Sequence, residues 1–177
     1  MMHVKIAKAD YTHPRFTNPD VAKDDWAGMA REATAALWRR KDSYPNLIAN
    51  GKMDKAEAEA DIAAWQEIAN DWDWICTGMG DHAHKDTLTA RIEAIDLAIF
   101  RFLQLLDRNH GCGNPDQLHQ GALLSTMRWW AQREANGNYL NHARFNASIG
   151  HTWRAENGHS PRGEMHTSEP NEERKAA

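Results

Sequence analysis

The sequence predicts an all-α protein, a bundle of four to five helices built around a central antiparallel hairpin. Apolar residues repeat at spacings of three and four in several segments, and no segment alternates apolar and polar residues as a strand would. The length of 177 residues, 41% of them hydrophobic, suits one core. We expect one helical domain over 18–154, an extended arm before it (1–17) and a disordered tail after it (155–177).

The first helix is expected to begin at Asn18-Pro19, a cap followed by a proline at the first helical position. It should end before Tyr44-Pro45, because the residue that precedes a proline is driven out of the α region. Its apolar face is Ala22, Trp26, Met29, Ala33 and Leu37.

The second helix should begin after Asp54, which has capping-box spacing to Glu57, and end at Gly78 and Gly80. Its apolar face is Ala58, Ile62, Trp65, Ile68, Ala69, Trp72, Ile75 and Cys76. With the third helix it would form the central hairpin.

The third helix should open at Asp86 or Thr87 and close at Gly111 and Gly113. Its apolar face is Leu88, Ile92, Ile95, Ile99, Phe102 and Leu106. Leu97 and Phe100 lie on a second face, so we expect this helix to be covered on more than one side.

Asn114-Pro115 repeats the cap-then-proline signal and predicts a fourth helix to Ala135, closed by Gly137. A fifth, less regular helix is expected from about 138 to 153.

The charge is uneven along the chain. The net charge is −4, which excludes a uniformly basic nucleic-acid coat, and residues 54–116 alone carry −8. These acidic residues are either solvated helix faces or a surface for a basic partner.

Membrane and secretion signals are not evident, so we expect a cytoplasmic protein with no membrane partner. No apolar run reaches the roughly 18 residues of a bilayer span, and the start has no signal-peptide apolar stretch. The cysteines, Cys76 and Cys112, are expected to be free thiols.

Two carboxylate pairs make a candidate Mg²⁺ site: Glu67 with Asp71, and Glu93 with Asp96. The segment from Glu93 to Asp107 resembles the second motif of the MazG-like all-α nucleotide pyrophosphohydrolases, in which Glu-x-x-Asp leads an apolar helix. That resemblance implies a metal-dependent pyrophosphohydrolase. The family's first motif, Glu-Glu-x-x-Glu, is reduced here to Gln66-Glu67-Ile-Ala-Asn70, and helical geometry turns Glu67 and Asp71 away from the apolar face, toward water.

Cysteine and histidine side chains form a weaker candidate for Zn²⁺, because their spacing fits no common zinc pattern. A local site of Cys76, His82 and His84 and a set of ordinary side chains both stay open. The other cysteine and histidine side chains considered as zinc ligands are His110, Cys112 and His119.

Arginines and aromatic rings are interleaved over residues 128–154, as on single-stranded nucleic-acid platforms. The candidate contacts are Arg128, Trp129, Trp130, Arg133 and Arg144. Core aromatic rings with arginines extending to solvent are the more common meaning of such a pattern.

The run from Trp38 to Ile68, with Tyr44-Pro45, then Gly51-Lys52-Met53 and an Ala-rich helix, resembles short proteins encoded by tailed phages and prophages. It implies no catalytic residue and no cofactor. We therefore favour a phage-type accessory protein that binds a protein partner through charged helical surfaces, for example as an inhibitor of a host system. A MazG-like enzyme and a nucleic-acid binder are the alternatives, and a homo-oligomer stays open.

Overall fold

The computed structural model describes residues 22–111, 113–136 and 142–159. These residues form helices and no strand, which confirms the all-α class. The helices are α1 (Trp26–Ala49), α2 (Lys55–Thr77), α3 (Leu88–Arg108), α4 (Pro115–Ala135) and α5 (His142–Glu156), with a 3-10 turn, η2, at Lys85–Thr87. The predicted arm and the expected cap at Asn18-Pro19 lie outside the described residues, as does the segment 160–177.

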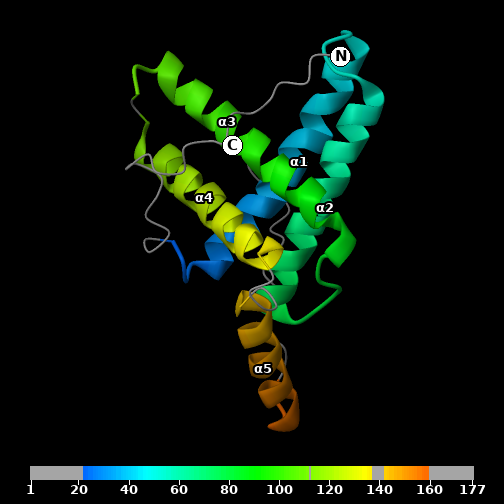
Figure 1. Cartoon of the computed structure of the whole chain (residues 1–177), viewed down its shortest axis with the longest axis vertical. Helices are drawn as coiled ribbons and strands as arrows, with labels where there is room; N and C mark the ends of the chain where they lie inside the picture. Colours follow the sequence, from blue (N-terminus) through cyan, green and yellow to red (C-terminus); the bar gives the residue numbers. More distant parts are fainter. Residues whose placement is uncertain (1–21, 112, 137–141, 160–177) are drawn as a thin grey trace, which may run out of the picture.

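The helices form two crossed pairs with α5 extending from one end (Figure 1). The most extensive packing is that of α1 on α2, followed by that of α3 on α4. The predicted hairpin partners α2 and α3 also contact each other, and α5 packs against α2. Among the described residues, no helix combines the length and apolar character that crossing a bilayer requires.

Local signals set several helix ends where the sequence predicts them. Asp54 caps α2 by accepting hydrogen bonds from the backbone of Ala56 (2.9 Å) and Glu57 (3.2 Å). Gly78 ends α2 in the left-handed conformation, with φ at 74°. Asn114 begins α4 with a complete capping box to Gln117.

The prediction for the first helix is wrong at both ends. It starts at Trp26, because the Asp25 carboxylate accepts the backbone N–H of Gly28 at 2.8 Å and caps it there. It also continues through Pro45 to Ala49. A proline removes one helical hydrogen bond, and the carbonyl it leaves unbonded belongs to Lys41, which is exposed to water.

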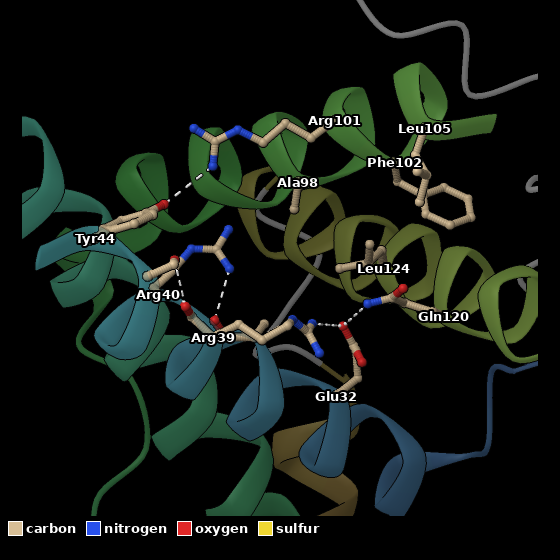
Figure 2. Close-up of a pocket in the computed structure, with 12 residues that line it drawn as sticks. Glu32, Arg39, Arg40, Tyr44, Ala98, Arg101, Phe102, Leu105, Gln120 and Leu124 are labelled. Carbon is tan, nitrogen blue, oxygen red and sulfur yellow. Dashed lines mark hydrogen bonds and ion pairs between the residues drawn. The ribbon is translucent and has the colours of Figure 1, made fainter. Parts of the chain in front are cut away.

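Tyr44 shows why the helix continues at that point. Its hydroxyl donates a hydrogen bond to the Asp61 carboxylate of α2. The same hydroxyl accepts a hydrogen bond from Arg101 Nη1 of α3 at 3.2 Å (Figure 2). Arg40 Nε binds the same carboxylate at 2.8 Å. These contacts hold the last turns of α1 against two other helices, and such tertiary contacts outweigh local propensity.

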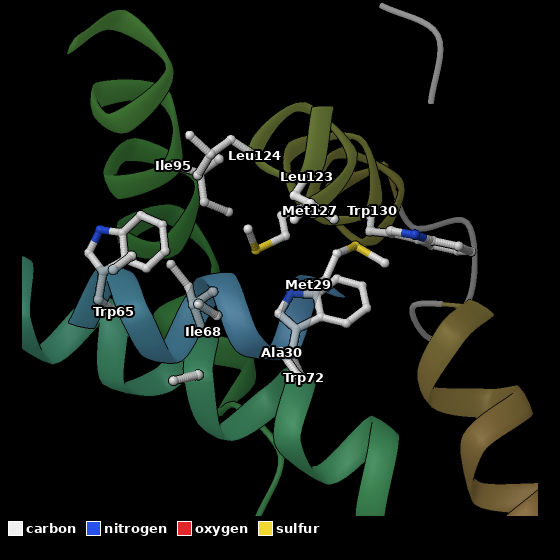
Figure 3. Packing of buried hydrophobic residues seen from close by; sticks show 14 of the residues in the cluster. Met29, Ala30, Trp65, Ile68, Trp72, Ile95, Leu123, Leu124, Met127 and Trp130 are labelled. Carbon is white, nitrogen blue, oxygen red and sulfur yellow. The ribbon is translucent and has the colours of Figure 1, made fainter. Parts of the chain in front are cut away.

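The core lies where α1, α2, α3 and α4 meet (Figure 3). The largest fully buried side chains include Met29, Trp65 and Met127, one from each of three helices. The predicted apolar faces of the second and third helices also contribute to the core, through Ile68, Ala69, Trp72, Ile75, Ile95, Ile99, Phe102 and Leu106. The expected second face of the third helix is covered only in part, since Leu97 is half-buried and Phe100 is 37% exposed.

The last helix also departs from prediction. Residues 138–141 of the expected fifth helix lie outside the described part of the chain. The helix runs on to Glu156, so its last two residues are helical although we expected them in the tail.

Replacing Met127 with alanine is expected to lower the free energy of unfolding by about 2–5 kcal/mol, because its side chain is fully buried and truncation leaves a cavity. Met79→Ala is the matched control, because Met79 is 41% exposed. This substitution should change the free energy of unfolding by roughly 0.5 kcal/mol or less. Urea unfolding measures both. Equal losses in the two variants would contradict this packing.

Stability should also fall more steeply at alkaline pH in the wild type than in Tyr44→Phe. Burial raises the pKa of the Tyr44 phenol, and its hydrogen bond to Asp61 raises it further. An unfolded tyrosine ionises near pH ~10. The folded state therefore retains a proton that the unfolded state loses, and this stabilisation disappears as the pH rises through the folded pKa. Ultraviolet difference titration should show that Tyr44→Phe lacks one phenol that ionises above the ordinary tyrosine range in the wild type. Identical titration curves of the two proteins at alkaline pH would contradict this.

Candidate functional surface on α5

The four carboxylates of the predicted Mg²⁺ site are not brought together. Glu67 accepts the backbone N–H of His84 at 2.9 Å. Asp96 pairs with an arginine of α4 at 2.7 Å, and Glu93 is exposed. Asp71 lies in a different cluster. Within the described part of the chain, no three His, Cys, Asp or Glu side chains are grouped so that they could hold a metal ion.

Asp71 is buried at 3% exposure, and the expectation that it faces water is wrong. Asp71 is enclosed by two other helices: Arg91 of α3 lies 3.7 Å from its Oδ2, and Arg144 of α5 binds both of its oxygens. Sequence periodicity identified the apolar face of α2 correctly but could not show that a second, polar face would be covered as well.

Asp71, Arg91, Glu134 and Arg144 form a buried cluster, called here the arginine–carboxylate cluster. Arg144 binds Asp71 with two hydrogen bonds, Nε to Oδ1 at 2.6 Å and Nη2 to Oδ2 at 2.8 Å. It also reaches Glu134 at 3.1 Å, and Arg91 Nη2 binds the same Glu134 oxygen at 3.1 Å. The backbone N–H of Ala83 completes the set by donating to Asp71 at 3.2 Å.

The cluster is electrically balanced, with two guanidinium groups and two carboxylates. Burial alone would lower the pKa of Arg144, but the hydrogen bonds and charge of Asp71, together with Glu134, raise it above its ordinary value. All four side chains are bound to one another, so the cluster has no free acid or base for chemistry. Its effect is to fasten α2, α3, α4 and α5 together.

The predicted zinc candidates are dispersed. His84 Nδ1 lies 3.2 Å from Glu67, and His82 packs edge-on against Trp74. His119 lies 3.5 Å from Asp25 at the start of α1. Cys112 lies outside the described residues.

Most of the predicted nucleic-acid contacts are engaged within the fold. Arg144 belongs to the arginine–carboxylate cluster, and Trp130 is buried. Arg128 pairs with Asp96 and also binds Gln132. Arg133 stacks over Trp129 with its guanidinium carbon 4.5 Å from the ring centroid. The five side chains therefore do not form an open platform.

The outer face of α5 carries the clearest functional feature of the molecule. Phe145, Ile149 and Trp153 are 45%, 53% and 55% exposed and recur every four residues. Side chains at this spacing line up along one face of a helix. We call this row the α5 ridge. Phe145 and Trp153 belong to the aromatic stretch 128–154, and their exposure departs from the core packing that is more common for such a pattern.

The inner face of α5 is built from small residues. Ala143 and Ala147 are buried against the bundle. His151 Nε2 lies 3.0 Å from the Trp74 carbonyl and packs edge-on against the Trp74 ring. A Cβ atom on Gly78 would lie 2.8 Å from His151 Cγ, so this glycine permits both the turn and the close approach of α5.

No family model matches the chain, and no curated protein or solved structure is detectably similar to it. The function must therefore be argued from the geometry.

Sequence reasoning missed the ridge although its signal is present. Large apolar residues occupy every fourth position from 145 to 153, while small residues occupy 143, 147 and 150. Periodicity shows that such a helix has two distinct faces. It does not show that the face with small residues is the buried one.

Replacing Asp71 with asparagine is expected to lower the free energy of unfolding by about 3–5 kcal/mol, because two buried guanidinium groups would share one carboxylate. Asp96→Asn is the control. Its pair with Arg128 is less deeply buried, so we expect a loss of about 1–2 kcal/mol. Urea unfolding gives both values, and amide hydrogen exchange over 143–156 should speed up only in Asp71→Asn. Equal effects of the two substitutions would refute this role of the cluster.

Proposed function

We propose that this chain is a non-enzymatic interaction protein that binds an amphipathic helix of a protein partner along α5. The observation that carries the proposal is the α5 ridge, three large apolar side chains about half exposed on one helix face. Soluble domains rarely leave such side chains aligned at the surface unless the patch binds something.

The geometry of the ridge favours a helix as the bound element. Side chains four residues apart form a continuous row, and two helices pack by fitting such rows into the grooves between them. α5 extends past the other helices, so its outer face is accessible along its length (Figure 1). Recognition would follow the helix-in-groove mode, in which apolar anchors recur at helical spacing.

A cavity beside the ridge provides a place for one anchor. It has a volume of about 210 Å³ and lies between α5, α2 and the start of α1, with Trp26, Ile75, Ala147 and Trp153 in its wall. Interfaces obtain most of their binding energy from a few large side chains that fill such pockets. A leucine or phenylalanine of the partner helix would suit it.

The polarity of α5 agrees with an interface. From 142 to 153 the helix contains no lysine, aspartate or glutamate, and its Arg144 is bound in the arginine–carboxylate cluster. Interface centres are depleted of charged residues in this way. The charged faces that we first expected to bind are less suitable, because acidic residues such as Asp61 and Asp96 already pair with arginines of the same chain.

The likeness to small phage-encoded proteins supports an accessory role, with a host protein as partner and the host cytoplasm as the place of action. Inhibition of a host system would follow if the bound helix belongs to a working surface of that partner. In the described structure, Tyr44 of the Tyr-Pro motif joins three helices, which supports an architectural reason for the motif.

The test is a photo-crosslinking side chain placed at position 149, with position 38 as the matched control. Trp38 is also exposed, at 64%, but it lies on α1. We expect position 149 alone to crosslink to one helix of a protein partner. Crosslinks only to a second copy of this chain, or equal crosslinking from both positions, would overturn the proposal.

Binding of the crosslinked partner should then be measured with purified proteins. We expect Ile149→Glu to weaken the dissociation constant at least ~10-fold, because it places a charge at the centre of an apolar interface. Trp38→Glu introduces the same charge on α1 and should alter the dissociation constant less than ~2-fold. Calorimetric titration distinguishes the two.

A further inference from the structure

A second hollow lies away from α5, between α1, α3 and α4. It has a volume of about 300 Å³ and combines two kinds of wall (Figure 2). One wall is apolar and the other is basic. The apolar side chains are Phe102, Leu105 and Leu124, and the basic ones are Arg39, Arg40 and Arg101.

The three arginines differ in how they are neutralised. Arg39 pairs with Glu32 at 2.5 Å, and Arg40 pairs with Asp61 at 2.8 Å. Arg101 contacts only the Tyr44 hydroxyl among the described residues, and no carboxylate there pairs with it. Arg101 is exposed, so the rim of the hollow carries one positive charge that faces water and that no described carboxylate pairs with.

Arg40 adds a fixed donor at the same place. The side chain is buried, its Nε is held by Asp61, its Nη1 donates to the Ala36 carbonyl at 3.0 Å, and its guanidinium stacks over the ring of Trp65 at 4.3 Å. Its remaining nitrogen, Nη2, has no partner among the described residues. In Figure 2 the guanidinium of Arg40 lies between α1 and α3, on the side of α3 from which Ala98 projects. Its position requires little ordering on binding.

We propose that this hollow binds a small amphipathic monoanion, a carboxylate attached to an aliphatic or aromatic body. The anionic group would bind between Arg101 and Arg40 Nη2, since guanidinium groups match the planar carboxylate. The body would lie against Phe102, Leu105 and Leu124. A single anionic charge is favoured because one positive charge is in excess.

This inference does not rest on the proposed function. All residues of the hollow come from α1, α3 and α4, and none comes from α5. A volume of 300 Å³ lies at the small end of ligand pockets, which suits a compact ligand better than a nucleotide.

The test uses the fluorescent dye 8-anilinonaphthalene-1-sulfonate, an aromatic monoanion, titrated against the full chain. Arg101→Gln removes the unbalanced charge, and Arg108→Gln makes the same change on the same helix at an exposed position outside the hollow. We expect saturable binding that Arg101→Gln weakens at least ~10-fold and Arg108→Gln changes less than ~2-fold. Benzoate should displace the dye, and the neutral dye N-phenyl-1-naphthylamine should be insensitive to Arg101→Gln.

Two further variants establish whether the dye binds in the hollow or on the α5 ridge. Ala98→Leu fills the hollow without changing charge and should abolish binding, while Ile149→Glu alters the α5 ridge and should leave binding unchanged. The proposal is overturned if the wild type shows no saturable binding, if the two arginine variants weaken it equally, or if binding is lost in Ile149→Glu. Stronger displacement by phenyl phosphate than by benzoate would overturn the carboxylate assignment.

Discussion

The buried arginine–carboxylate cluster is the interaction on which the rest of the structure depends. Removing a single charge from water costs several kcal/mol, and this cost is offset only when every partner is present. Asp71, Arg91 and Glu134 come from three helices of the bundle, and Arg144 comes from α5. Separating α5 would leave two carboxylates facing one guanidinium, so Arg144 of α5 completes the charge balance of the cluster. The position of α5 is therefore set by this pairing together with the apolar contacts of Ala143 and Ala147.

This attachment explains how α5 can present large apolar residues to water. Most amphipathic helices bind their domain through their large side chains, and this burial stabilises them. In α5 the large side chains, Phe145, Ile149 and Trp153, face outward, and Ala143 and Ala147 face inward. The contacts of small residues alone would hold the helix weakly. The arginine–carboxylate cluster and the contact of His151 with the Trp74 carbonyl add polar interactions that hold α5 on the bundle.

Helix ends could be predicted from the sequence where residues close to the end determine it. Asp54, Gly78 and Asn114-Pro115 act on their own backbone, and the helix ends they predict are found. The features that could not be predicted depend on partners far along the chain. The helix passes Pro45 because Tyr44 meets Asp61 and Arg101, and Asp71 is buried because Arg144 lies 73 residues away in the sequence. The same limit applies to the candidate sites, since no local pattern shows which face of α5 is covered.

One helix connects the two surfaces proposed for binding. Asp61 and Asp71 both belong to α2 and are ten positions apart, a helical rise of about 15 Å. Asp61 holds Arg40 at the hollow, and Asp71 holds Arg144 at the base of α5. α2 is one continuous helix packed along α1, so the same element positions both surfaces. Coupling between the two surfaces would require a second packing arrangement of α2 that one ligand prefers.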